Sequence, residues 1–132
     1  MAQATDPITI LVVEDEAVIR MCTASTLEDA GFRVLGADCS AEAIEILSCH
    51  AEISILMTDV HMPGQMNGLG LVAQVRRDHP DIRAIVVSGN TSAADASMAG
   101  ATGFLAKPFL AQTMIQAVND TIKRHLAGPR AA

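Results

Sequence analysis

The sequence predicts an α/β protein with a parallel sheet built from five βα units. Strand-like apolar runs alternate with helical patterns along the 132 residues, which is typical of such units. Half of the residues are apolar, enough for a substantial core, and the length fits one domain. We expect an N-terminal extension at 1–6, the domain at 7–126 and a flexible tail at 127–132.

The expected strands are short apolar runs, and four of them end on polar residues. They cover 8–13, 32–37, 53–58, 82–87 and 103–106. The first run leads into Glu14 and Asp15, and the third leads into Asp59. The fourth leads into Ser88 and the fifth into Lys107. Because the carboxyl ends of parallel strands share one edge of the sheet, these side chains can converge on one crevice.

The segments between the strands carry helical spacing and helix-ending residues. Gly31 suits the left-handed turn that ends the first helix, and Ser40 is the expected N-cap of the second. A loop rich in turn formers at 62–68 precedes the third helix, which ends near Pro80. The last two helices are expected at 92–99 and 110–125. The expected apolar positions are Ile19, Cys22, Leu27 and Ala30, then Ile44 and Leu47, then Leu71, Val72 and Val75, and finally Met114, Val118, Thr121, Ile122 and His125.

Composition and charge exclude several classes of function. A formal net charge of -6 argues against binding a nucleic-acid backbone, and three Phe with no Trp or Tyr leave few platforms for stacking bases. Three cysteines, Cys22, Cys39 and Cys49, have no paired spacing, so neither a disulfide framework nor a zinc site is expected. The start of the chain lacks the pattern of a signal peptide, and no run could span a bilayer. We therefore expect a cytoplasmic protein with no nucleic-acid or membrane partner.

Three carboxylates at one edge favour a metal ion. Glu14, Asp15 and Asp59 would repel one another unless a hard cation joined them, and Mg2+ takes oxygen ligands while keeping several waters. A carboxylate can attack phosphorus, which makes Asp59 the candidate for an aspartyl phosphate. Lys107 could neutralise the phosphoryl charge and Ser88 could donate a hydrogen bond to it. Taken singly, each residue has a plainer role as a loop, turn or surface residue, and only the combination is specific.

Four short motifs surround these polar residues. They are Leu11-Val12-Val13-Glu14-Asp15-Glu16, Thr58-Asp59-Val60-His61-Met62-Pro63-Gly64, Val87-Ser88-Gly89 and Ala106-Lys107-Pro108-Phe109. In order and approximate spacing, they resemble the motifs of receiver domains of two-component response regulators. The resemblance covers nearly the whole chain. It implies a flavodoxin-like fold, with a five-stranded parallel sheet in the order 2-1-3-4-5 and helices on both faces.

The resemblance also implies a role for each site residue. Asp59 would accept a phosphoryl group from a histidine kinase or a histidine phosphotransfer protein. Asp15, Asp59 and the main-chain carbonyl of His61 would bind Mg2+, or Mn2+ in its place. Glu14 would act mostly through water. Lys107 would pair with Asp59 at rest and with the phosphoryl group afterwards.

A phosphorylation switch is a further implication. Ser88 would move toward the phosphoryl oxygen, Phe104 would turn inward, and the Lys107-Pro108 peptide bond would be cis. The surface around the fourth helix, fifth strand and fifth helix would then bind a downstream protein, or the phosphoryl group would pass onward. Such a domain promotes only its own phosphorylation and dephosphorylation, and is a monomer or a phosphorylation-dependent dimer. Three residues depart from the family's commoner choices: Glu14 for Asp, Ser88 for Thr and Phe104 for Tyr.

Three alternatives stay open on the sequence. A flavodoxin-like carrier of FMN would need Ser, Thr and Gly after the first strand, where Glu14 and Asp15 would repel a phosphate. A phosphatase working through an aspartyl phosphate, as haloacid-dehalogenase-like enzymes do, needs a second Asp two positions after the first. Here that position holds Ala17 or His61. A receiver that no longer signals by phosphorylation is disfavoured by the intact set of polar residues.

Overall fold

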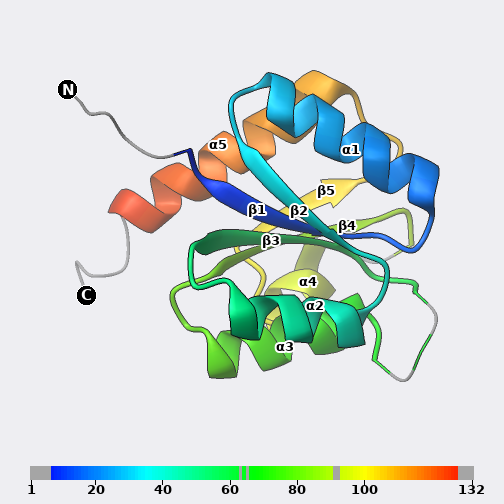
Figure 1. The fold of residues 1–132 in the computed structure, drawn as a ribbon, viewed down its shortest axis with the longest axis vertical. Coiled ribbons are helices and arrows are strands. Elements are labelled where there is room, and N and C mark those ends of the chain that lie inside the picture. Colours follow the sequence, from blue (N-terminus) through cyan, green and yellow to red (C-terminus); the bar gives the residue numbers. More distant parts are fainter. Residues whose placement is uncertain (1–6, 63, 65, 91–92, 128–132) are drawn as a thin grey trace.

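The structure is a five-stranded parallel sheet in which a helix follows every strand (Figure 1). This computed structural model describes residues 7–62, 64, 66–90 and 93–127, with side chains up to residue 123. The strands are β1 (Thr9–Val13), β2 (Arg33–Ala37), β3 (Ile53–Asp59), β4 (Arg83–Ser88) and β5 (Gly103–Ala106). The helices are α1 (Ala17–Asp29), α2 (Ser40–Cys49), α3 (Gly68–Asp78), α4 (Ala93–Met98) and α5 (Ala111–Ala127). The order β2-β1-β3-β4-β5 confirms the predicted flavodoxin-like topology.

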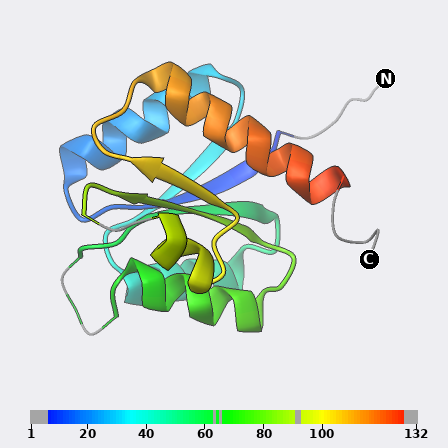
Figure 2. The ribbon, with the colours of Figure 1, turned by 180° about the vertical axis from the view of Figure 1, so that it is seen from behind.

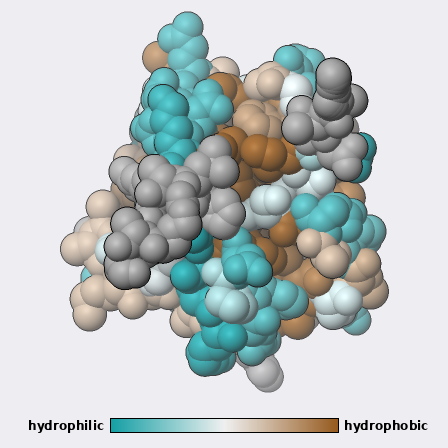
Figure 3. Space-filling view, turned by 90° about the vertical axis from the view of Figure 1, so that its left-hand side faces the viewer, coloured by the Kyte–Doolittle hydropathy of each residue, from teal (hydrophilic) through white to brown (hydrophobic). Residues whose placement is uncertain are grey.

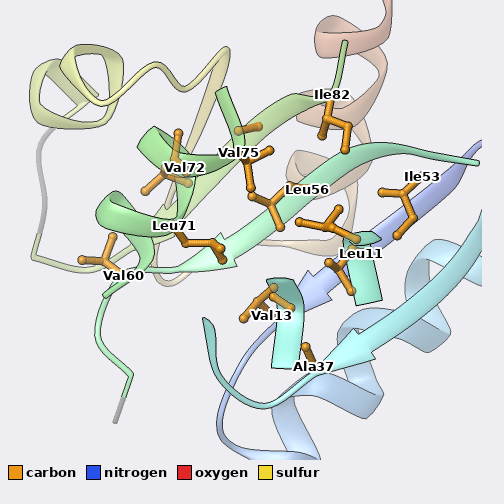
Figure 4. Close-up of a cluster of buried hydrophobic side chains, with 14 of the residues drawn as sticks. Leu11, Val13, Ala37, Ile53, Leu56, Val60, Leu71, Val72, Val75 and Ile82 are labelled. Carbon is orange, nitrogen blue, oxygen red and sulfur yellow. The ribbon is translucent and has the colours of Figure 1, made fainter. Parts of the chain in front are cut away.

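Helices cover both faces of the sheet. Helices α1 and α5 lie on one face, and α2, α3 and α4 lie on the other (Figures 1 and 2). Along β1, Ile10 and Val12 join the apolar cluster under α1 and α5, whereas Leu11 and Val13 join the cluster on the opposite face. Figure 4 shows this second cluster, where side chains of β1 and β3 meet those of α3. Because both faces are buried, the strand is a continuous apolar run instead of an alternating one.

The parallel register brings the strand ends to one edge of the sheet. Val13 pairs with Thr58 and Ser88 pairs with Ala106, so the residues that follow these positions lie along the same edge. This edge is on the right of Figure 1. Figure 3 views the opposite edge, where apolar surface lies between separate groups of hydrophilic side chains. The polar residues that follow the strands therefore lie together at one end of the sheet.

Most of the predicted elements are confirmed. Every strand agrees with its predicted bounds to within one residue, and Gly31 has a φ of 101°, in the left-handed region. The predicted apolar face of α3 is buried, as are Met114, Val118 and Thr121 of α5. The predictions for 1–6, for Pro63, for Ser92, for most of the tail and for the side chain of His125 fall outside the described residues. Within the described part of the chain, none of the helices has the length and apolar character that a membrane span needs.

The predicted N-cap of α2 was wrong. Cys39 occupies the N-cap position, and Ser40 is the first residue of the helix. The buried hydroxyl of Ser40 donates a hydrogen bond to the main-chain carbonyl of Met66 at 3.0 Å. Ser40 therefore joins α2 to the loop between β3 and α3, which is a long-range contact that no local pattern reveals.

The predicted apolar face of α1 was also largely wrong. Of its four positions only Leu27 is buried, while Ile19, Cys22 and Ala30 are exposed. The aliphatic part of Arg20 instead lies against β2, as long cationic side chains do when their charged end stays near a polar partner. The apolar side chains in the first turns of α1 are therefore exposed next to the end of β1.

Candidate functional site

Three carboxylates lie together at the carboxyl edge of the sheet. One oxygen from each of Glu14, Asp15 and Asp59 lies within 4.8 Å of those of the other two. Glu14 is 5% exposed and Asp59 is 9% exposed, whereas Asp15 is exposed to solvent. Topology alone causes this convergence, because β1 and β3 are neighbours and end at the same edge.

The carboxylate of Asp59 is fixed by a hydrogen bond to each oxygen. Its Oδ1 accepts from the main-chain N–H of Val60 at 2.7 Å, and its Oδ2 accepts from Nζ of Lys107 at 2.8 Å. The hydroxyl of Thr58 donates to the main-chain carbonyl of Asp59 at 2.8 Å. The end of β3 therefore presents this carboxylate in one orientation.

The ammonium of Lys107 contacts two of the three carboxylates, those of Asp59 and Glu14. Its Nζ also lies 3.6 Å from Oε1 of Glu14. Burial alone would lower the pKa of Lys107, but the hydrogen bond and charge of Asp59 raise it above its ordinary value, and Glu14 adds to the rise. Burial raises the pKa of Glu14 to about 7; the N–H of Glu16, 3.1 Å from Oε2, opposes this rise and the charge of Asp59 adds to it. One ammonium thus contacts two of the three clustered carboxylates, and this all-oxygen donor set fits a hard divalent cation such as Mg2+.

Gly68, the first residue of α3, sets how closely the chain returns to Asp59. A Cβ at Gly68 would overlap the main-chain oxygen of Asp59, and the Gly68 N–H donates to the carbonyl of Val60 at 2.9 Å. The side chain of Asn67 caps the helix by accepting from the N–H of Gly70 at 3.0 Å. The sequence analysis treated this stretch only as a turn-rich loop and missed Gly68. Its signal is the Asn-Gly pair at a helix start.

The remaining predicted residues lie along the same edge or next to it. Ser88 is buried at the end of β4, and its Oγ accepts from the main-chain N–H two residues later at 3.1 Å. Phe104 of β5 is partly buried and packs against the cluster under α2, α3 and α4. His61 follows β3 closely and its side chain is exposed. The Lys107-Pro108 peptide bond is cis.

Two further features border the carboxylates and were missed in the sequence. Nη1 of Arg20 donates a hydrogen bond to the main-chain carbonyl of Glu14 at 2.7 Å. A cleft of about 870 Å3 begins at Asp15 and is walled by Ile44 and Met66, so the site is open on the side of α2. The cleft joins segments that meet only in the folded chain, and no sequence motif marks the hydrogen bond of Arg20, which spans six residues.

Comparison with known proteins identifies the family. Residues 10–119 match the response regulator receiver domain. Sensor kinase CckA of Brucella abortus is 37% identical over 120 residues, which cover 88% of this chain and 13% of that protein. Chemotaxis protein CheY1 of Helicobacter pylori is 36% identical over 111 residues, covering 80% of this chain and 89% of that protein.

Solved structures agree with this assignment. A response regulator receiver domain protein from Clostridium thermocellum superposes with a TM-score of 0.81 at 30% identity, covering 89% of this chain and 95% of that one. A response regulator receiver protein from Sinorhizobium medicae gives a TM-score of 0.81 at 30% identity, covering 91% and 98%. The family match, at residues 10–119, includes Glu14, Asp15 and Asp59. The chain belongs to the response regulator receiver domain family.

Proposed function

We propose that Asp59 accepts a phosphoryl group from a phosphohistidine of a histidine kinase or histidine phosphotransfer protein, in a cytoplasmic two-component or phosphorelay system. The observation that carries the proposal is the placement of Asp59. Its carboxylate is held between the ammonium of Lys107 and the carboxylates of Glu14 and Asp15, at an edge that is open to a partner. The segment 7–126 is the proposed receiver.

The transfer is an in-line displacement at phosphorus. A carboxylate oxygen of Asp59 forms the new P–O bond, the P–N bond to the donor imidazole breaks, and that nitrogen keeps the electron pair. Lys107, already 2.8 Å from the acceptor carboxylate, neutralises charge on the phosphoryl oxygens. Asp15, Asp59 and the main-chain carbonyl of His61 would hold Mg2+ or Mn2+, with Glu14 acting through water. The ion would supply further positive charge for the phosphoryl oxygens.

The donor has to contact the elements that surround Asp59. Helix α1 begins two residues after Asp15, and its first turns expose apolar side chains, Val18, Ile19 and Met21. Met21 is 68% exposed. A helical partner that buries these side chains would bring its phosphohistidine to the open edge of the site. We assign the donor to this face of α1.

The response surface is proposed around α4, β5 and α5. The hydroxyl of Ser88 would donate a hydrogen bond to a phosphoryl oxygen. Phe104 would move further into the apolar cluster that it already contacts. The surface nearby carries Met98, 88% exposed, and a cleft of about 490 Å3 lined in part by Phe104 and Leu110. A downstream protein, or a second copy of the phosphorylated domain, would bind there.

The proposal is tested with a small phosphodonor. Acetyl phosphate with Mg2+ should give an alkali-labile mass gain of one phosphoryl group, and Asp59→Asn should abolish it. Labelling of Asp59→Asn to the wild-type extent would contradict the proposed site. Labelling of the wild type to the same extent with and without Mg2+ would also contradict it. Ser88→Ala should still be labelled but should fail to change partner binding. A flavin-coloured purified protein, or many turnovers on phosphomonoesters, would support the FMN carrier or the phosphatase instead.

A further inference from the structure

The main chain at the end of β1 is held from two sides. The N–H of Glu14 donates to the carbonyl of Ala37 at 3.0 Å, which continues the pairing of β1 with β2. The carbonyl of Glu14 accepts from Nη1 of Arg20 at 2.7 Å, a short distance that is typical of a charged donor. This carbonyl belongs to the peptide unit that leads into Asp15. Arg20 therefore contacts the main chain between two of the three carboxylates.

The side chain of Arg20 packs against β2 at a glycine, where the strand has no side chain. Gly36 of β2 lies under the arginine, and a Cβ built on Gly36 would be 3.3 Å from Cδ of Arg20. The backbone of Gly36 is not in the left-handed region, so an alanine there meets no conformational penalty of its own. A Cβ at Gly36 would therefore press on the arginine side chain that donates to Glu14, which would have to shift slightly. Substitution of either residue perturbs one and the same contact.

We infer that Arg20 is a positioning residue for the metal-binding carboxylates, which it orients through the carbonyl of Glu14 without contacting the metal. The inference rests on the proposed function, because it assumes that these carboxylates bind Mg2+. In the part of the chain that the structure describes, Glu14 is held at its side chain by the N–H of Glu16 and at its carbonyl by Arg20. Partners that orient metal ligands in this way contribute strongly to metal affinity.

A purely stabilising role predicts a different result, and Arg76 supplies the matched control. Arg76 of α3 also donates Nη1 to main-chain carbonyls, those of Pro80 at 3.0 Å and Ile82 at 2.8 Å. These acceptors precede β4 and therefore lie at the amino end of the sheet, opposite the site. Loss of Arg76 removes the same kind of contact without disturbing the carboxylates.

The experiment measures Mg2+ binding to the metal-free protein by NMR titration, together with the melting temperature. Arg20→Ala should raise the Kd for Mg2+ about tenfold. Arg20→Lys should raise it less, because an ammonium keeps the charge and one donor. Gly36→Ala should raise the Kd in the wild type but leave it unchanged in the Arg20→Ala background, since the two substitutions remove one contact. Arg76→Ala should lower the melting temperature and leave the Kd unchanged.

Acetyl phosphate labelling gives a second measurement. At saturating Mg2+ the labelling rate of Arg20→Ala should return to near the wild-type value, because only the affinity for the ion is lost. An unchanged or tighter Kd in Arg20→Ala would overturn the inference. A Gly36→Ala effect that persists without Arg20, or a Kd loss in Arg76→Ala equal to that in Arg20→Ala, would do the same. Failure of the wild type itself to bind Mg2+ would instead overturn the proposed function, and the inference with it.

Discussion

Mg2+ binding should weaken as the pH falls through 7, because protons compete for Glu14. Burial raises the pKa of this carboxyl to about 7, with the negative charge of Asp59 adding to the rise. Below that pH Glu14 is mostly neutral and contributes no charge to the site. When Mg2+ binds only the ionised form of Glu14, the apparent Kd for Mg2+ equals the high-pH Kd multiplied by a factor. This factor is one plus the proton concentration divided by the acid dissociation constant of Glu14. That factor makes the Kd about tenfold weaker near pH 6 than near pH 8.

The assay is an Mg2+ titration at several pH values, with two variants as controls. Glu14→Gln keeps the shape of the side chain but cannot ionise, so its Kd should be weak and nearly independent of pH. His61→Gln removes the exposed imidazole next to the site and keeps the main-chain carbonyl, so it should retain the wild-type pH dependence. A wild-type Kd that stays constant over this range would refute the reasoning. So would a pH dependence that survives in Glu14→Gln.

The raised pKa of Glu14 makes the stability of the metal-free protein depend on pH in the opposite direction to Mg2+ binding. The pKa of Glu14 in the folded state, about 7, lies above its unfolded value of 4.5, so the folded state binds the proton more tightly. The contribution to the free energy of unfolding is therefore present below pH 4.5 and is lost as the pH rises through 7. Glu14→Gln should remove this loss. Low pH thus stabilises the fold through Glu14 while it weakens metal binding.

Three further substitutions test the contacts around Asp59. Lys107→Ala removes the ammonium from two buried carboxylates and should lower the free energy of unfolding in metal-free protein by about 1 to 2 kcal/mol in urea titrations. Added Mg2+ should restore part of this loss, and no restoration would argue against a shared site. Gly68→Ala forces a Cβ against the carbonyl of Asp59 and should cost about 1 to 3 kcal/mol. Asn67→Ala removes only the cap of α3 and should cost about 1 kcal/mol without slowing phosphoryl labelling; a smaller cost for Gly68→Ala than for Asn67→Ala would refute the close-approach argument.

The strands were predictable because each signal is local and strong. A strand buried on both faces is a continuous apolar run, and the polar residue that ends it marks the edge of the sheet. Helix α4 was the weakest of the helix predictions because its local signal is weak. It is built from Ala, Ser, Asp and Met, and Ala96 is its buried residue within Ala93–Met98. Its bounds depend on tertiary packing, which periodicity does not record.

The gathering of the carboxylates was predictable, but the contacts that hold them were not. Convergence needs only the strand order and the parallel register, which alternation of strands and helices already indicates. The hydrogen bond from Ser40 to Met66 joins segments 26 residues apart, and that from Arg20 joins α1 back to the carbonyl of Glu14 over six residues. Such bonds leave no periodicity and no motif. For α1, buried positions were expected at Ile19, Cys22 and Ala30, which are exposed, whereas the aliphatic part of Arg20 packs against β2.

Glu14, where the family more often has Asp, acquires a physical explanation from its contacts. Its Oε2 accepts from the N–H of Glu16 at 3.1 Å while its Oε1 lies 3.6 Å from Nζ of Lys107. The longer side chain can therefore bind the turn into α1 and still face the cation at the centre of the site. With its carbonyl held by Arg20, Glu14 links the main chain of that turn to the charges around Asp59. Burial and then the charge of Asp59 raise the pKa of Glu14, and Asp59 raises the pKa of Lys107 against the effect of burial.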